Sequence, residues 1–463
     1  MCAAGIAALG VALLPAAAIA TTTPADVTAT ATDSFGLPFS YHIQVPSPWN
    51  GTLVLYSHGY SFTPSGPSDV GDPATGAWLL SNGYAIAGSS YSTSGWALQQ
   101  AFVDQMQTLD IFYSTFGTPV RTIAWGHSLG GMITAGLVQL FPDRFAGAIP
   151  MCGVVAGGPG VWNQGLDSEF ALNTLQFKTP VKLTGFTSFT DAANNFGLAS
   201  AELNSAQSTA EGRARIALSA ALADVPGWVD PLSPEPAPTD FAAQEANQVA
   251  WDNNVDFLFA FFGRAELESP LRANGNFSWN TGVDYRVQLS HSSDFAEVQG
   301  LYAAAGLDLN RDLQTLNAAP RISADPGAVA YLSKYITYNG NLAMPVLSMH
   351  TTGDGLVEVT DENAYASVVR SAGDNSMLRQ IFVHRAGHCT FTPAETVTAF
   401  QTLINRLDTG HWVGPSVADL NANAAALGPG FNLLAPGVPA GPSFIDFHPD
   451  TFLRPFDARN VMG

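Results

Sequence analysis

The chain has 463 residues, of which 46% are hydrophobic and only 12% are charged, and its formal net charge is −20. This composition is typical of a globular chain with an ample core and differs from that of a disordered one. The negative charge would repel nucleic acid and anionic lipid headgroups, so neither is an expected partner.

The first segment resembles an export signal. Residues 3–20 form an apolar, Ala-rich run that ends in Ala18-Ile19-Ala20, a small-residue cleavage pattern. The pattern predicts a signal peptide over 1–20. No basic residue precedes the apolar run, so the start of the natural protein could lie upstream of Met1. A membrane anchor is the competing interpretation, but the run is short and contains Pro15. We expect a secreted, extracellular or periplasmic protein with no stable membrane anchor.

Residues 21–152 alternate between short apolar segments and helix-forming ones. We expect strands and helices in the order Phe39–Val45, Thr52–Ser57, helix Gly76–Ser81, Tyr84–Gly88, helix Trp96–Phe116, Arg121–Trp125, helix Met132–Phe141 and Gly147–Met151. Such alternation predicts an α/β fold with a doubly wound, mostly parallel sheet.

The alternation stops over residues 153–342, which we interpret as a large, mainly helical insertion. Helical patterns cover Ser208–Ala223 and Gln244–Phe262. The aromatic run Phe257–Phe262 either belongs to the insertion's own core or has one face that lines a pocket for an acyl or aromatic group. The sequence leaves both open.

Residues 343–409 resume the alternation, and residues 410–463 form an extension rich in Gly, Pro and Ala that we expect to pack on the core. The second core segment predicts strands and helices over Met344–His350, helix Asp361–Ser371, Arg379–His384 and helix Pro393–Leu407.

A nucleophile elbow is the most informative motif of the chain. Gly126-His127-Ser128-Leu129-Gly130 lies between a predicted strand and a predicted helix. A sharp strand-to-helix turn exposes the serine hydroxyl, and glycines on either side avoid steric clashes. Ser128 is therefore the candidate nucleophile. An ordinary serine in a Gly-rich turn is the alternative.

A serine nucleophile needs a base and an acid that orients it, and in elbow enzymes these follow later in the chain. Asp354 and His388 come after the last two predicted strands, in loops at the same sheet edge as Ser128. Glu358, further along the same loop, is the alternative acid if Asp354 does not orient the histidine. Asp361 is expected to cap the following helix. His384 is expected to be a structural residue inside its strand, and His350 to close the preceding strand.

Two backbone amides are expected to form an oxyanion hole. The amide of Leu129 lies at the start of the predicted helix after Ser128, and the amide of Tyr60 follows Gly59 in the loop after the Thr52–Ser57 strand. Gly59 would permit close approach of the two segments. A plain tight turn is the alternative for this loop.

Cys2 would leave with the signal, so Cys152 and Cys389 remain as a pair in an exported chain. A disulfide between them is expected, with two buried free thiols as the alternative. We find no metal-ligand cluster, no dinucleotide or P-loop motif and no CxxC, and we expect no metal and no cofactor. The segment Asp308–Asp312 lacks features of a calcium loop and is expected to cap a helix.

These motifs resemble those of the α/β-hydrolase superfamily over Phe39–Met151 and Met344–Arg406. The resemblance implies an α/β-hydrolase fold with the insertion in the lid position after the sixth strand. His388-Cys389 is also similar to the tannase and feruloyl-esterase branch, where a cysteine beside the histidine is bridged to one beside the nucleophile. Here His127 precedes Ser128, so the tannase substrate does not follow.

The prediction is a secreted serine hydrolase that cleaves carboxylic esters, small or polymeric, through an acyl-enzyme. A serine peptidase of the same fold and an extracellular polyester depolymerase are alternatives, and an inactive binding module is a further one from a different class. The sequence gives neither the acyl length nor the oligomeric state.

Overall fold

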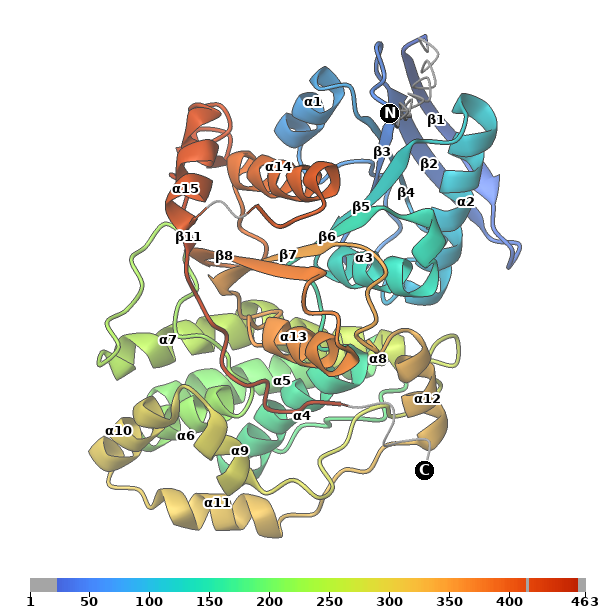
Figure 1. The fold of residues 1–463 in the computed structure, drawn as a ribbon. Helices are drawn as coiled ribbons and strands as arrows, with labels where there is room; N and C mark the ends of the chain where they lie inside the picture. The colour runs from blue at the N-terminus through green and yellow to red at the C-terminus, as the bar shows by residue number, and fades with distance from the viewer. Residues whose placement is uncertain (1–22, 414–415, 457–463) are drawn as a thin grey trace, which may run out of the picture.

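The computed structural model describes residues 23–413 and 416–456, so the predicted signal peptide lies outside the described residues. A nine-stranded sheet crosses the molecule in the order β1-β2-β4-β3-β5-β6-β7-β8-β11 (Figure 1). The bounds are β1 Ala25–Thr32, β2 Pro38–Val45, β3 Thr52–Ser57, β4 Ala85–Ser89, β5 Arg121–His127, β6 Gly147–Met151, β7 Val346–Gly353, β8 Leu378–Ala386 and β11 Phe444–Ile445.

The six central strands of the sheet, β4, β3, β5, β6, β7 and β8, run parallel to one another. Strands β1 and β2 at one edge and β11 at the other are antiparallel to their neighbours. The predicted α/β-hydrolase fold with a mostly parallel sheet is confirmed. Strand β1 was not predicted. It consists largely of Ala and Thr, with every second residue exposed, so it carries little hydrophobic signal.

Helices cover both faces of the sheet. In β3, Leu53 and Leu55 belong to one buried cluster and Val54 and Tyr56 to the other, as expected for a strand buried on both sides. Figure 1 shows α1, α14 and α15 on one side and α3 and α13 on the other. These helices and α2 have the bounds α1 Pro73–Ser81, α2 Leu98–Phe116, α3 Leu129–Leu140, α13 Asp361–Ala372, α14 Pro393–Thr409 and α15 Val417–Ala426.

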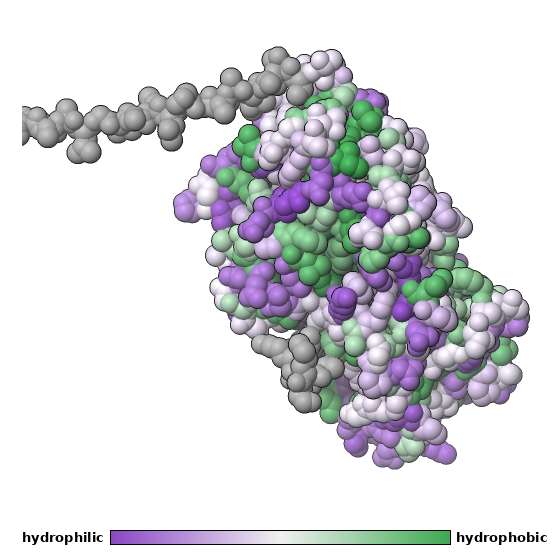
Figure 2. All heavy atoms as spheres, turned by 90° about the vertical axis from the view of Figure 1, so that its right-hand side faces the viewer, coloured by the Kyte–Doolittle hydropathy of each residue, from purple (hydrophilic) through white to green (hydrophobic). Residues whose placement is uncertain are grey.

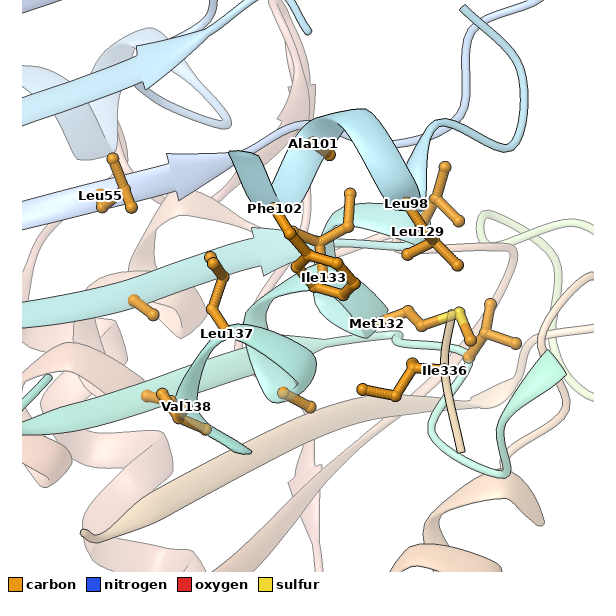
Figure 3. Packing of buried hydrophobic residues seen from close by; sticks show 14 of the residues in the cluster. Leu55, Leu98, Ala101, Phe102, Leu129, Met132, Ile133, Leu137, Val138 and Ile336 are labelled. Carbon is orange, nitrogen blue, oxygen red and sulfur yellow. The ribbon is translucent and has the colours of Figure 1, made fainter. Parts of the chain in front are cut away.

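The helix that follows Ser128 is fixed by apolar packing along its length. Figure 3 shows Met132 and Ile133 of α3 beside Phe102 of α2, with Ile336 closing the cluster from the segment before β7. All four side chains are buried. The start of α3 is therefore held rigidly against the sheet.

Between β6 and β7 the described chain is largely helical and has a hydrophobic cluster of its own. Its α-helices are α4 Gly158–Leu175, α5 Phe189–Gln207, α6 Ala210–Ala221, α7 Phe241–Trp251, α8 Arg264–Leu267, α9 Tyr285–His291, α10 Phe295–Ala305, α11 Leu309–Ala318 and α12 Pro326–Lys334. Two π-helical segments, Asp252–Asp256 and Leu258–Gly263, stand where the sequence predicts one continuous helix. We call the segment from α4 to α12 the helical insertion.

The C-terminal extension packs on the sheet. Strand β11 pairs with β8, and Phe444 is buried in the cluster beneath α14 and α15. Two further short strands, β9 Leu433–Ala435 and β10 Val438–Pro439, pair with each other. The described part of the extension thus contacts the core through β11 and Phe444.

Figure 2 shows hydrophobic and hydrophilic residues intermixed over one face of the molecule. Within the described ranges, no helix combines the length and the apolar character needed to cross a membrane.

Candidate active site

Ser128 lies at a strained turn between β5 and α3. Its backbone has φ 59° and ψ −126°, a conformation that side-chain-bearing residues rarely adopt. A Cβ on Gly130 would lie 1.9 Å from the carbonyl oxygen of Ser57, and one on Gly126 would lie 2.3 Å from that of Gly130. Only glycine fits at either position, as the motif predicts.

The structure brings Ser128, His388 and Asp354 together. His388 Nε2 lies 2.7 Å from Ser128 Oγ, and His388 Nδ1 lies 2.8 Å from Asp354 Oδ2. With Nδ1 donating to the carboxylate, Nε2 is free to accept the serine proton. This arrangement can activate the hydroxyl for attack on a carbonyl carbon.

Asp354 is buried and ionised. Burial alone would raise its pKa, but the neighbouring His388 and His350 outweigh burial and lower the pKa to about 2. Its Oδ1 also accepts the backbone N–H groups of Leu356 and Val357, each at 3.1 Å. The carboxylate is therefore fixed in place and charged at neutral pH.

A second histidine, His350, contacts the carboxylate of Asp354. His350 Nε2 lies 3.6 Å from Asp354 Oδ2 and donates to the carbonyl of Val357 at 2.9 Å, while Nδ1 lies 3.2 Å from Glu362 Oε1. Both ring nitrogens face acceptors, an arrangement that favours the imidazolium form. Burial opposes this charge, yet Asp354 and Glu362 raise the pKa of His350 to about 10. The sequence placed His350 only at the end of a strand, because no spacing rule links it to Glu362.

The loop after β3 approaches Ser128 closely. A Cβ on Gly59 would lie 3.3 Å from Ser128 Cβ, and the loop is held by Tyr91, whose Oη donates to the carbonyl of His58 at 3.0 Å. Among the described residues, neither the amide of Leu129 nor that of Tyr60 has a hydrogen-bond acceptor. Two unpaired amides beside the nucleophile are what an oxyanion hole requires.

A disulfide joins Cys152, directly after β6, to Cys389, directly after His388. It ties the histidine loop to the sheet edge on which the elbow stands. The bond closes a segment with a sequence separation of 237, so its stabilisation in the chain-entropy model is at most about 5 kcal/mol.

The other acidic and histidine candidates lie apart from this chain of hydrogen bonds. Glu358 lines the cavity beside Ser128, and His384 lies near Glu235 with its side chain 43% exposed. The prediction for Asp361 was wrong: Thr360 occupies the N-cap of α13, and the Asp361 carboxylate accepts the amide of Ala156. Asp308, by contrast, caps α11 as predicted.

A cavity of about 910 Å³, including space open to solvent, lies between Ser128 and the helical insertion. Phe257 and Phe259 line it, whereas Phe261 and Phe262 pack against other rings of the insertion. Part of this aromatic run therefore belongs to the core of the insertion, and part lines the cavity. In the described part of the chain, no three His, Cys, Asp or Glu side chains are grouped so as to hold a metal ion.

The chain is similar to the o-phthalyl amidase of Xanthobacter agilis, with 30% identity over 415 residues, which covers 84% of this chain and 89% of the amidase. The chain belongs to the same family as this amidase, and its fold is that of the α/β-hydrolases. No protein-family model matches this hydrolase.

The hydrolase is also similar to solved structures at low identity. Feruloyl esterase B from Aspergillus oryzae matches with 15% identity and a TM-score of 0.41, covering 84% of this chain and 81% of the esterase. An esterase from Pyrococcus furiosus matches with 8% identity and a TM-score of 0.40, covering 84% of this chain and 92% of the esterase. The acylaminoacyl peptidase of Pyrococcus horikoshii matches with 11% identity and a TM-score of 0.36, covering 80% of this chain but 38% of the peptidase.

Proposed function

We propose that this hydrolase cleaves carboxylic esters through an acyl-enzyme formed on Ser128. The observation that carries the proposal is the continuous chain of hydrogen bonds from Asp354 through His388 to Ser128 Oγ. No metal or cofactor is assigned a role.

In the first half of the reaction, His388 Nε2 takes the proton of Ser128 as Oγ attacks the ester carbonyl carbon. The amides of Leu129 and Tyr60 hold the oxyanion, and Asp354 stabilises the imidazolium. The tetrahedral intermediate then expels the alcohol, which receives the proton from His388. Water attacks the acyl-enzyme in the same way and releases the acid.

Amide hydrolysis is the second candidate, because the relative at 30% identity is named an amidase. The same residues would act, with His388 protonating an amine rather than an alcohol. The peptidase alternative would use the same three side chains and would need a subsite for a peptide terminus in addition. The polyester alternative favours an open cleft, whereas the helical insertion lines much of the cavity beside Ser128. The presence of all three catalytic side chain types disfavours an inactive binding module.

We also propose that the protein acts outside the cytoplasm. The apolar run before Ala20 has the features of a signal peptide, and a disulfide persists most readily in an oxidising compartment. The test is N-terminal sequencing of protein collected from the culture fluid or the periplasm. Retention in the cytoplasm with an uncleaved leader would contradict this proposal.

The function is tested with p-nitrophenyl esters from acetate to palmitate and with matching p-nitroanilides. Ser128→Ala should lower turnover at least about a thousandfold, whereas Ser114→Ala, a change at an exposed helical serine, should not. A preference for anilides would favour the amidase candidate. Folded wild type that cleaves neither series, or activity that survives Ser128→Ala, would overturn the proposal.

A further inference from the structure

The cavity beside Ser128 contains an unusual number of buried carboxylates. Glu169, Asp252 and Glu358 line it and are only 8%, 3% and 9% exposed, and half-buried Asp256 joins them. Glu169 Oε2 and Asp256 Oδ2 are enclosed and have no hydrogen-bond partner in the described protein. Carboxylates are rarely buried in this way unless something pairs with them.

The protein supplies little compensating charge. Arg264 lies behind the cavity wall, stacked over Trp162 and Phe277, and its nearest carboxylate is that of Glu268 at 3.9 Å. It lies near Glu169 but forms no ion pair with it. Across the described ranges, no lysine or arginine forms an ion pair with Asp252, Asp256 or Glu358 either.

Burial and mutual repulsion disturb these carboxylates strongly. Burial, only partly offset by Arg264, raises the pKa of Glu169 to about 7. Burial together with the charges of Glu169 and Glu245 raises the pKa of Asp252 to about 8. A positive charge in the cavity would relieve both effects at once.

Aromatic rings complete the lining. Tyr60, Trp96, Trp162, Phe257 and Phe259 line the same cavity as the carboxylates. Aromatic faces attract organic cations, and the attraction is strongest where water is excluded. The rings and carboxylates together therefore match an ammonium group attached to an apolar body.

The local backbone also sets this wall apart. Asp252, Asp256 and Phe259 come from the two consecutive π-helical segments, and π-helical turns occur frequently at functional sites. The carboxylates are not gathered as a cluster of metal ligands within the described ranges. The spacing of the carboxylates therefore favours an organic cation over a metal ion.

We propose that this cavity binds an organic ammonium group of the substrate, so that the hydrolase acts on esters or amides carrying a positive charge. This inference rests on the proposed function for the identity of the reacting group. It adds a recognition role for Glu169, Asp252, Asp256 and Glu358, with the scissile carbonyl at Ser128.

The first experiment compares two substrates of equal length, p-nitrophenyl 6-aminohexanoate and p-nitrophenyl heptanoate. The wild type should show a kcat/KM at least about tenfold higher for the ammonium ester. A second pair, acetylcholine and 3,3-dimethylbutyl acetate, places the charge in the alcohol half. A preference for the cation in either pair supports the inference, and no preference in both pairs overturns it.

The second experiment removes two of the carboxylates. In Glu169→Gln/Asp252→Asn, the ratio of kcat/KM for the ammonium ester to kcat/KM for the heptanoate should fall towards one. The matched control is Asp143→Asn/Asp446→Asn, which removes two carboxylates from exposed positions and should keep the preference. An unchanged preference in the first double variant would overturn the inference. If that variant does not fold, the wild-type comparison still decides.

A binding measurement separates this inference from the proposed function. Calorimetry on Ser128→Ala should show hexylammonium binding at least about tenfold more tightly than 1-hexanol. Ester hydrolysis without a preference for cations would refute the inference alone. Tight hexylammonium binding by a protein that cleaves no ester or amide would refute the function alone.

Discussion

Replacing His350 with leucine tests the buried charge behind the active site. The substitution removes an imidazolium from between Asp354 and Glu362 and leaves two carboxylates in the protein interior without their shared cation. Glu362 would keep only its hydrogen bonds from Ser348 and Gln380. Breaking a buried ion pair from one side typically costs about 3–5 kcal/mol, and we expect a loss of that size.

The double variant His350→Leu/Glu362→Leu distinguishes charge from packing. Since it removes both partners of the pair, it should be more stable than His350→Leu alone. The free energy of unfolding is measured by urea titration at pH 7, and the two single variants and the double variant complete a thermodynamic cycle. A loss below about 1 kcal/mol in His350→Leu, or no recovery in the double variant, would refute the ion pair.

The pH dependence supplies an independent check. The folded-state pKa of His350 is raised from 6.5 to about 10, so its contribution to stability is fully present below pH 6.5 and is lost as the pH rises through 10. The stability advantage of the wild type over His350→Leu should therefore shrink between pH 7 and pH 10. If the stability advantage of the wild type grew between pH 7 and pH 10, the pKa of His350 would not be raised in the folded state.

Three further outcomes follow from the same geometry. Asp354→Asn should fold and lower kcat by about 10⁴, because the amide cannot hold the required histidine tautomer; a loss under tenfold would point to another acid. Cys152→Ser/Cys389→Ser should lower the unfolding free energy by up to about 5 kcal/mol and reduce kcat, and equal values of both would contradict a bridge. Because the pKa values of Glu169 and Asp252 are raised to about 7 and about 8, the folded state binds more protons than the unfolded one between about pH 4 and pH 8. Unfolding free energy should therefore fall as the pH rises through this window, and less steeply in Glu169→Gln/Asp252→Asn; equal slopes would contradict the shifts.

The sequence identified the parts of the site that depend on strand order. Ser128, Asp354 and His388 each follow a strand of the parallel sheet, and parallel strands place their carboxyl ends at one edge. Glycines with no room for a Cβ, such as Gly130, marked the elbow. The parallel core could therefore be predicted from local patterns.

Other features depend on contacts between distant segments, which local patterns do not encode. Strand β1 follows from pairing with β2 and not from the hydrophobicity of its Ala and Thr residues. The π-helical turns at Asp252–Asp256 interrupt an ordinary helical pattern. Glu169 and Glu358 lie far apart in sequence, so their common cavity emerges only when the helical insertion packs above the sheet.

The most direct test of Ser128 as nucleophile is labelling with an alkyl fluorophosphonate, followed by peptide mass spectrometry. Attack by Oγ displaces fluoride and leaves one phosphonyl group on the serine, which requires a hydroxyl activated by histidine. The proposed mechanism predicts a single adduct on Ser128 that is lost in His388→Ala. An adduct on another serine, or none on folded wild type, would contradict it.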